Sequence, residues 1–191
     1  MNGSVRPRAP SAITLAGVRP VRRVIHEDPR GTLVETLRID DPGGERFAMA
    51  YTSVTRPGEF RDRDRWHVHR VQSDRFIVPV GEMTLALLDG RPGSTTEGQL
   101  EVIRMVGSPY RPRAGGGRSE LETYLVPIPP GVLHCIGNLS DAPFVLVNSP
   151  TELYDPADEG RVPFPERIIP ALGRPFTWEI VQQTPGAVGG A

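Results

Sequence analysis

Three of the four histidines in this 191-residue chain fall in two short segments that are far apart in the sequence. His67 and His69 form an H-x-H pair, and His134 lies in the run 129–138, which opens with Pro-Pro-Gly. Side chains alternate across a β-strand, so an extended H-x-H segment points both imidazoles to one face. A small β-barrel would enclose such a face. The histidine pattern therefore favours a barrel with imidazoles in its interior.

Short β-prone runs separated by turn residues follow one another along the chain. Glycine and proline number 21 each, and they separate runs of six or seven residues at 32–38, 75–80, 82–88, 122–128 and 143–148. Such spacing is typical of a β-sandwich or barrel. No window of ten residues has a helical period, although residues 156–159 could form a short helix. The sequence predicts an all-β protein.

The length fits one domain with a real core. We expect a single domain over 21–184, with flexible tails at 1–20 and 185–191. The glycine-rich segment 107–119 is expected to be a long flexible loop.

Composition excludes several classes of partner. The net charge of −1 and the lack of a basic helix indicate no nucleic-acid partner and no membrane surface. The sequence contains no run of about 18 apolar residues, so no transmembrane helix is predicted. It also has no continuous apolar stretch near the N-terminus, so no signal peptide is predicted. Cys135 is the only cysteine, which fits a reducing compartment and a cytoplasmic location.

The spacing of the two histidine segments resembles the two motifs of the cupin superfamily. His67, His69, Asp74 and Gly81 match the first motif, with aspartate where cupins normally have glutamate. The run from Pro129 through His134 to Asn138 matches the second. The resemblance implies a cupin double-stranded β-helix, a jelly-roll barrel.

Two kinds of chemistry fit such a site, beside a structural interpretation in which the histidines only form hydrogen bonds in a polar patch. His67, His69, Asp74 and His134 could be ligands of a divalent transition metal such as iron, manganese, nickel or zinc. Without a metal, a neutral histidine could remove a proton from a carbon next to a ketone. The H-x-H pair alone does not separate the two.

Further segments resemble the dTDP-4-dehydrorhamnose 3,5-epimerase family between about residues 22 and 168. The run 28–35 is similar to its D-x-R-G-x-F-x-E opening, 53–61 to S-x-S-x-x-G-V-L-R, and 89–98 to D-L-R-x-x-S-P-T-x-G. The run 128–134 matches I-P-P-G-F-A-H, and 151–156 resembles T-D-Y-Y-A-P. Their order and spacing together carry the resemblance.

The resemblance implies a metal-free enzyme, without a cofactor, that epimerises carbons beside the ketone of a nucleotide-linked 4-keto-6-deoxysugar. His67 would be the general base, and His69 and Tyr154 further catalytic residues. The resemblance also implies a homodimer. The expected substrate-binding residues, with arginines suited to a diphosphate, are Arg30, Glu35, Arg61, Arg65, His134 and Asn148.

Two departures from the family keep other hypotheses open. The family's lysine, which stabilises an enolate, has no counterpart: Asp74 follows Gln72-Ser73, and all 22 basic residues are arginine. The family's acid tyrosine falls on Asn148. Metal-free 3,4-ketoisomerases of the same sugars have a similar H-x-H pair. The main hypothesis is thus an epimerase or isomerase, the second a metal-dependent cupin enzyme, and the third a non-catalytic sugar-binding cupin.

Overall fold

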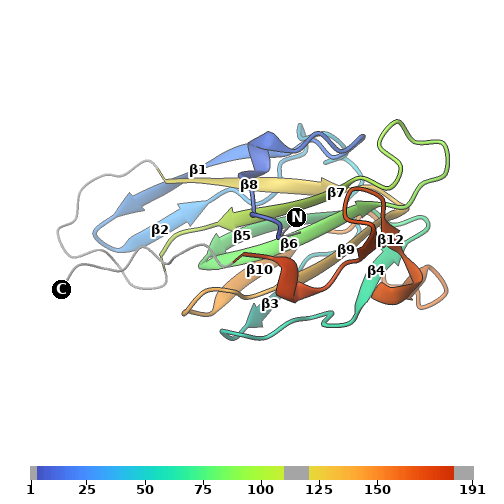
Figure 1. The fold of residues 1–191 in the computed structure, drawn as a ribbon. Coiled ribbons are helices and arrows are strands. Elements are labelled where there is room, and N and C mark those ends of the chain that lie inside the picture. The colour runs from blue at the N-terminus through green and yellow to red at the C-terminus, as the bar shows by residue number, and fades with distance from the viewer. Residues whose placement is uncertain (1–3, 110–120, 183–191) are drawn as a thin grey trace.

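The computed structural model describes residues 4–109 and 121–182 and contains two antiparallel β-sheets packed face to face (Figure 1). The six-stranded sheet has the order β2-β1-β8-β5-β10-β3, and the five-stranded sheet the order β11-β4-β9-β6-β7. The strands of the two sheets are β1 Val21–Asp28, β2 Gly31–Val34, β3 Tyr51–Thr55, β4 Arg65–His69, β5 Asp74–Val80, β6 Glu82–Asp89, β7 Leu100–Val106, β8 Leu121–Ile128, β9 Val132–Gly137, β10 Phe144–Asn148 and β11 Glu159–Pro163.

The remaining regular elements are small. Strands β12 Ile168–Ile169 and β13 Arg174–Pro175 form a separate two-stranded sheet. Three 3-10 turns, η1 Pro10–Ala12, η2 Phe164–Glu166 and η3 Trp178–Ile180, are the helical elements of the described residues. No helix in those parts of the chain is long and apolar enough to cross a membrane. The all-β prediction is confirmed.

Four of the five predicted strands coincide with β5, β6, β8 and β10, and the fifth is shorter than expected. β2 ends at Val34 rather than at residue 38, because the chain then turns and Asp41 accepts a hydrogen bond from the backbone N–H of Arg38 (2.7 Å). The helix expected at 156–159 is wrong. Residues 156–158 form a turn, and Glu159 begins β11, where it pairs with His69.

Two apolar clusters flank the five-stranded sheet. The first lies between the sheets and includes Leu85 and Leu87 of β6. The second lies on the outer face, where Ala86 and Leu88 pack beneath the C-terminal segment that carries Phe176 and Trp178. Because both faces of β6 are covered, its sequence is continuously apolar from Leu85 to Leu88 instead of alternating with polar residues.

The prediction of a flexible tail over 1–20 is wrong for residues 4–20. Val5 forms a β-bridge with Val181, and Arg8 forms one with Ile103 of β7. Leu15 and Val18 are buried to 2% and 4% exposure in the core between the sheets. Their burial offsets the entropy lost on ordering this segment. The tail expected at 185–191, and most of the loop expected at 107–119, lie outside the described residues.

A tight turn at Gly81 carries the chain from β5 in one sheet to β6 in the other. Gly81 has φ +85°, and a Cβ atom there would lie 2.5 Å from the carbonyl oxygen of Pro143. Only glycine accepts both the positive φ and the close approach. The turn therefore helps to place β5, whose first residue is Asp74, opposite the histidine strands.

Candidate active site

His67 and His134 are direct partners on neighbouring strands of the five-stranded sheet. β4 pairs with β9 at this position, and the two ring centroids are 5.0 Å apart. His69 lies on the same face of β4, with its ring centroid 4.6 Å from that of His67. Trp66 belongs to the cluster on the outer face. Strand alternation thus places both members of the H-x-H pair toward the space between the sheets.

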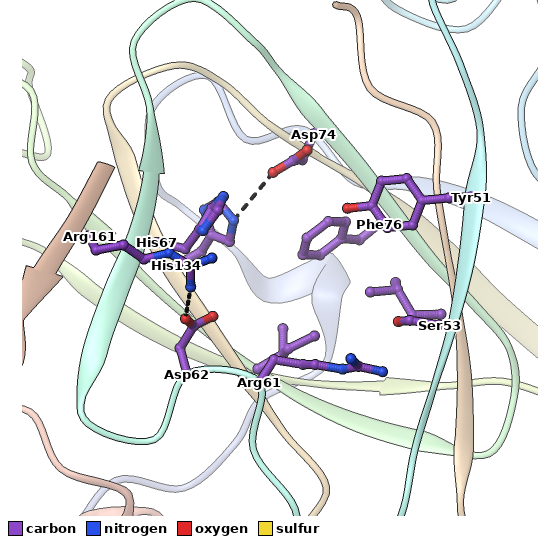
Figure 2. Close-up of a pocket in the computed structure, with 11 residues that line it drawn as sticks. Tyr51, Ser53, Arg61, Asp62, His67, Asp74, Phe76, His134 and Arg161 are labelled. Atoms are coloured by element: carbon purple, nitrogen blue, oxygen red, sulfur yellow. Dashed lines mark hydrogen bonds and ion pairs between the residues drawn. The ribbon is translucent and has the colours of Figure 1, made fainter. Parts of the chain in front are cut away.

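A cavity of about 330 Å³ lies beside these histidines (Figure 2). It combines polar and charged groups with an apolar part formed by Phe76, Ile136 and Leu146. A few polar groups set in apolar surroundings are typical of small-molecule sites. The lining residues are Tyr51, Ser53, Arg61, Asp62, His67, Asp74, Phe76, His134, Ile136, Leu146 and Arg161.

Asp74 is a buried carboxylate on which several side chains converge. Its Oδ1 accepts hydrogen bonds from Gln72 Nε2 (2.8 Å) and Asn148 Nδ2 (2.7 Å), and its Oδ2 lies 3.3 Å from His134 Nε2. Burial acts to raise the pKa of Asp74. The hydrogen bond and attraction of His134, together with the Asn148 bond, outweigh burial and lower the pKa to about 2. Asp74 is therefore ionised at neutral pH.

Asp158, in the turn before β11, binds the loop that follows His69. Its carboxylate accepts hydrogen bonds from the backbone N–H groups of Arg70 (2.9 Å), Val71 (2.7 Å) and Gln72 (3.0 Å). Burial acts to raise the pKa of Asp158, but these backbone bonds lower it below its ordinary value. An ionised carboxylate only accepts hydrogen bonds. His69 Nδ1, which lies 3.1 Å from Asp158 Oδ2, therefore carries a proton.

The two ring nitrogens of His69 connect Asp158 to His67. His69 Nε2 lies 2.9 Å from His67 Nε2. His69 Nε2 also lies 3.1 Å from Gln72 Nε2, which donates to Asp74. Burial, followed by repulsion from His134 and His69, lowers the pKa of His67 to about 3. His67 is therefore a neutral imidazole, oriented by a chain of contacts that ends at Asp158.

Tyr51 and Asn148 form a second polar group at the cavity. They are partners across β3 and β10. Asn148 is fully buried, and its Nδ2 donates to the Tyr51 hydroxyl oxygen (2.9 Å) as well as to Asp74. Figure 2 shows this hydroxyl directed into the cavity. Burial raises the pKa of Tyr51, so its hydroxyl keeps its proton at neutral pH.

The two arginines at the cavity differ in how their charge is balanced. Arg161 is ion-paired with Asp62 and with Glu159 (2.6 Å). Arg61 donates instead to neutral acceptors, the hydroxyl of Thr55 (3.1 Å) and the carbonyl oxygen of Val54 (2.8 Å). The positive charge of Arg61 is thus not balanced by an ion pair among the described residues, and it suits an anionic ligand.

Three of the four predicted metal ligands lie together. One ligand atom each from His67, Asp74 and His134 lies within 4.8 Å of the others. His69 is not in this group, because its Nδ1 is bound to Asp158 and its Nε2 faces His67. Two imidazoles and one carboxylate form a donor set that suits a divalent transition metal.

Several residues predicted for the site do not reach the cavity of this single chain. Arg30 pairs with Asp28 on an exposed turn. Glu35 pairs with Arg38, and Arg65 pairs with Asp64. Tyr154 is 65% exposed and does not line the cavity. The roles given to Arg30, Glu35, Arg65 and Tyr154 stay predictions.

Sequence reasoning missed several residues that the structure brings to the site, and four of them are charged or phenolic. These four are Tyr51, Asp62, Arg161 and Asp158. One of them had a signal: Tyr51 lies two residues before Ser53, where the family-like run begins, and so shares its strand face. The other three reach the site only through the pairing of strands and turns.

The chain has relatives of known description. A probable low-salt glycan biosynthesis epimerase, Agl13 of Haloferax volcanii, is 34% identical over 149 residues, which cover 73% of this chain and 82% of that protein. The spore coat polysaccharide biosynthesis protein SpsL of Bacillus subtilis is 30% identical over 155 residues, covering 80% and 92%. The chain belongs to the dTDP-4-dehydrorhamnose 3,5-epimerase-like family of cupins. The resemblance inferred from the motifs is confirmed.

Solved structures agree on the fold. A dTDP sugar isomerase from Desulfovibrio desulfuricans G20 superimposes with a TM-score of 0.70 at 24% identity, covering 88% of this chain and 95% of that one. The jelly-roll cupin prediction is thereby confirmed. No protein-family model matches the sequence. Membership of the epimerase-like family makes this protein an enzyme of the isomerase class.

Proposed function

We propose that this epimerase-like protein acts on a nucleotide-linked 4-keto-6-deoxysugar, with His67 as the general base. The enzyme would remove a proton from a carbon beside the ketone and return a proton to the same carbon. Such a carbon is acidic because the ketone delocalises the charge left behind as an enolate. A histidine side chain is the group most often used for this kind of proton transfer.

The observation that carries the proposal is the oriented, neutral imidazole of His67 at the cavity wall. A base must be unprotonated before the reaction, and the lowered pKa ensures this at neutral pH. The contacts from Asp158 through His69 hold the ring in one orientation. As negative charge develops on the substrate, attraction raises the proton affinity of His67 in the transition state.

The charged groups at the cavity support a nucleotide sugar as the substrate. Arg61 donates only to neutral acceptors among the described residues, and its guanidinium can offer N–H donors to a diphosphate. The dTDP sugar isomerase with the same fold acts on a ligand of this kind by its name. The homodimer and the cytoplasmic location stay predictions from the sequence.

The test is proton exchange with solvent. The protein is incubated in heavy water with dTDP- and UDP-linked 4-keto-6-deoxyglucose, and the sugar signals are followed by NMR. We expect deuterium to enter a carbon beside the ketone, with an inverted product. Retention of all substrate protons with both nucleotides would contradict the proposal.

The cluster of His67, Asp74 and His134 favours a second candidate, a metal-dependent cupin enzyme. These three residues would hold a divalent ion, which would supply a Lewis acid for the ketone. The chain itself would still orient the ligands, since Asn148 and Gln72 position the Asp74 carboxylate. Elemental analysis of untagged protein decides: about one metal ion per chain, lost in a His134→Ala variant, would support this candidate.

A further inference from the structure

Inversion at a carbon needs two groups on opposite sides of the substrate. One removes the proton, and the other delivers a proton to the opposite face. His67 supplies the first group in the proposed function. Position 148, where the family resemblance places the acid tyrosine, carries an asparagine, whose amide is too weak an acid to donate the proton.

We propose that Tyr51 is the proton donor of this reaction, so that the phenol is supplied by β3 instead of by its partner position on β10. This inference rests on the proposed function and deepens it. Tyr51 and Asn148 are Cα partners in the strand register. A phenol at position 51 can therefore reach the same part of the cavity from the neighbouring strand.

The hydrogen bond at the Tyr51 hydroxyl leaves the phenol proton available. Asn148 Nδ2 donates to the phenol oxygen. That oxygen is thus held as an acceptor while its own proton stays unused, and no acceptor for this proton is found within residues 4–109 and 121–182. The Asn148 bond also stabilises the phenolate that forms when the proton leaves. Asn148 is in turn held by Asp74 and by the backbone N–H of Arg75 (2.9 Å).

Tyr51 also has the right place in the cavity. Figure 2 shows Tyr51 across the cavity from His67 and His134, with the Phe76 ring drawn between them in this view. The other candidate donors in the lining are engaged: His134 Nε2 faces Asp74, and Asp62 is ion-paired with Arg161. The hydroxyl of Ser53 is a far weaker acid than a phenol.

The step balances without a further reactant. His67 takes the proton, its N–H bond forms, and the C–H electron pair enters the enolate. The enolate carbon then takes the proton of Tyr51, which forms the new C–H bond and leaves a phenolate. After product release, solvent protonates Tyr51 and removes the proton from His67, so the net reaction is inversion alone.

The test separates proton removal from proton delivery. Tyr51→Phe is incubated in heavy water with the nucleotide sugars that the wild type converts, and both the product and the recovered substrate are analysed by NMR. We expect the inverted product to fall by about 10²- to 10⁴-fold. We also expect the recovered substrate still to gain deuterium within about tenfold of the wild-type exchange rate, because His67 is intact.

The matched control is Tyr124→Phe. Tyr124 packs against the core on β8 and does not line the cavity, so removal of its hydroxyl should leave both rates unchanged. Thermal unfolding checks that Tyr51→Phe is folded. Wild-type product formation in Tyr51→Phe would overturn the inference, and so would equal loss of exchange and product in a folded variant. A wild type that neither exchanges nor inverts would instead overturn the proposed function, and this inference with it.

Discussion

Asp158→Asn is the change that most directly tests how His67 is oriented. In its best orientation the asparagine keeps its carbonyl oxygen toward the N–H groups of Arg70 and Val71. Its amide N–H₂ then replaces Oδ2 and faces two donors, the N–H of Gln72 and the protonated Nδ1 of His69. At least one of these two N–H groups therefore loses its acceptor. The hydrogen bond that orients His69 beside His67 is also lost or reversed, because an amide N–H₂ cannot accept the proton on His69 Nδ1.

The expected magnitudes follow from these contacts. A buried donor without a partner costs about 1–3 kcal/mol. In a chain of this size that lowers the melting temperature by roughly 2–12 °C. Loss of a group that orients a functional imidazole costs about 10- to 100-fold in activity. KM should change little, because Asp158 does not line the cavity.

The assay combines thermal unfolding with steady-state kinetics on the nucleotide sugar. Asp155→Asn is the control, because it removes the same charge from the same turn, and the Asp155 carboxylate bonds only the nearby N–H of Ala157 among the described residues. An Asp158→Asn enzyme whose kcat stays within twofold of the wild type would refute the reasoning. A fall in kcat equal to that of Asp155→Asn would do the same.

Three further predictions follow from the site. His67→Ala should abolish turnover and leave the protein folded, since losing an interior imidazole costs less than losing a packed apolar side chain; unchanged turnover with the nucleotide sugar would contradict proton transfer by His67. Asp74 has a pKa lowered from 3.8 to about 2. A lowered pKa stabilises the fold above the unfolded value, so about 2 kcal/mol is present at neutral pH and is lost as pH falls from about 4 to 2. Urea unfolding at several pH values should show this loss in the wild type and not in Asp74→Asn. Elemental analysis of untagged protein should find no stoichiometric metal if His67 acts as a base; about one ion per chain would favour the metal-dependent alternative.

The structure changes the meaning of the two departures from the family pattern. Asp74, at the place of an expected cation, is an ionised anchor for His134, Gln72 and Asn148. Asn148, at the place of the acid, donates a hydrogen bond to the phenol of its strand partner, Tyr51. Both departures therefore belong to one connected network at the cavity wall. Neither connection could be deduced from the position of the residue in the sequence.

The strands and the shared face of the histidines were predictable because they are encoded locally. Period-two alternation and turn residues depend on neighbours in the chain, and they predicted β5, β6, β8 and β10. The same alternation placed His67 and His69 on one face. The order of the motifs placed His134 in the same site, because the resemblance to the family implies which distant strands are neighbours.

The tertiary structure alone decided which side chains meet. Asp158 binds His69 across 89 positions of sequence, and Asn148 reaches Tyr51 across 97. These contacts depend on strand register and on where turns bring the chain back, and local patterns contain neither. The N-terminal segment was misjudged for the same reason: Leu15 and Val18 are too few apolar residues to form a recognisable strand, yet both are buried in the core between the sheets.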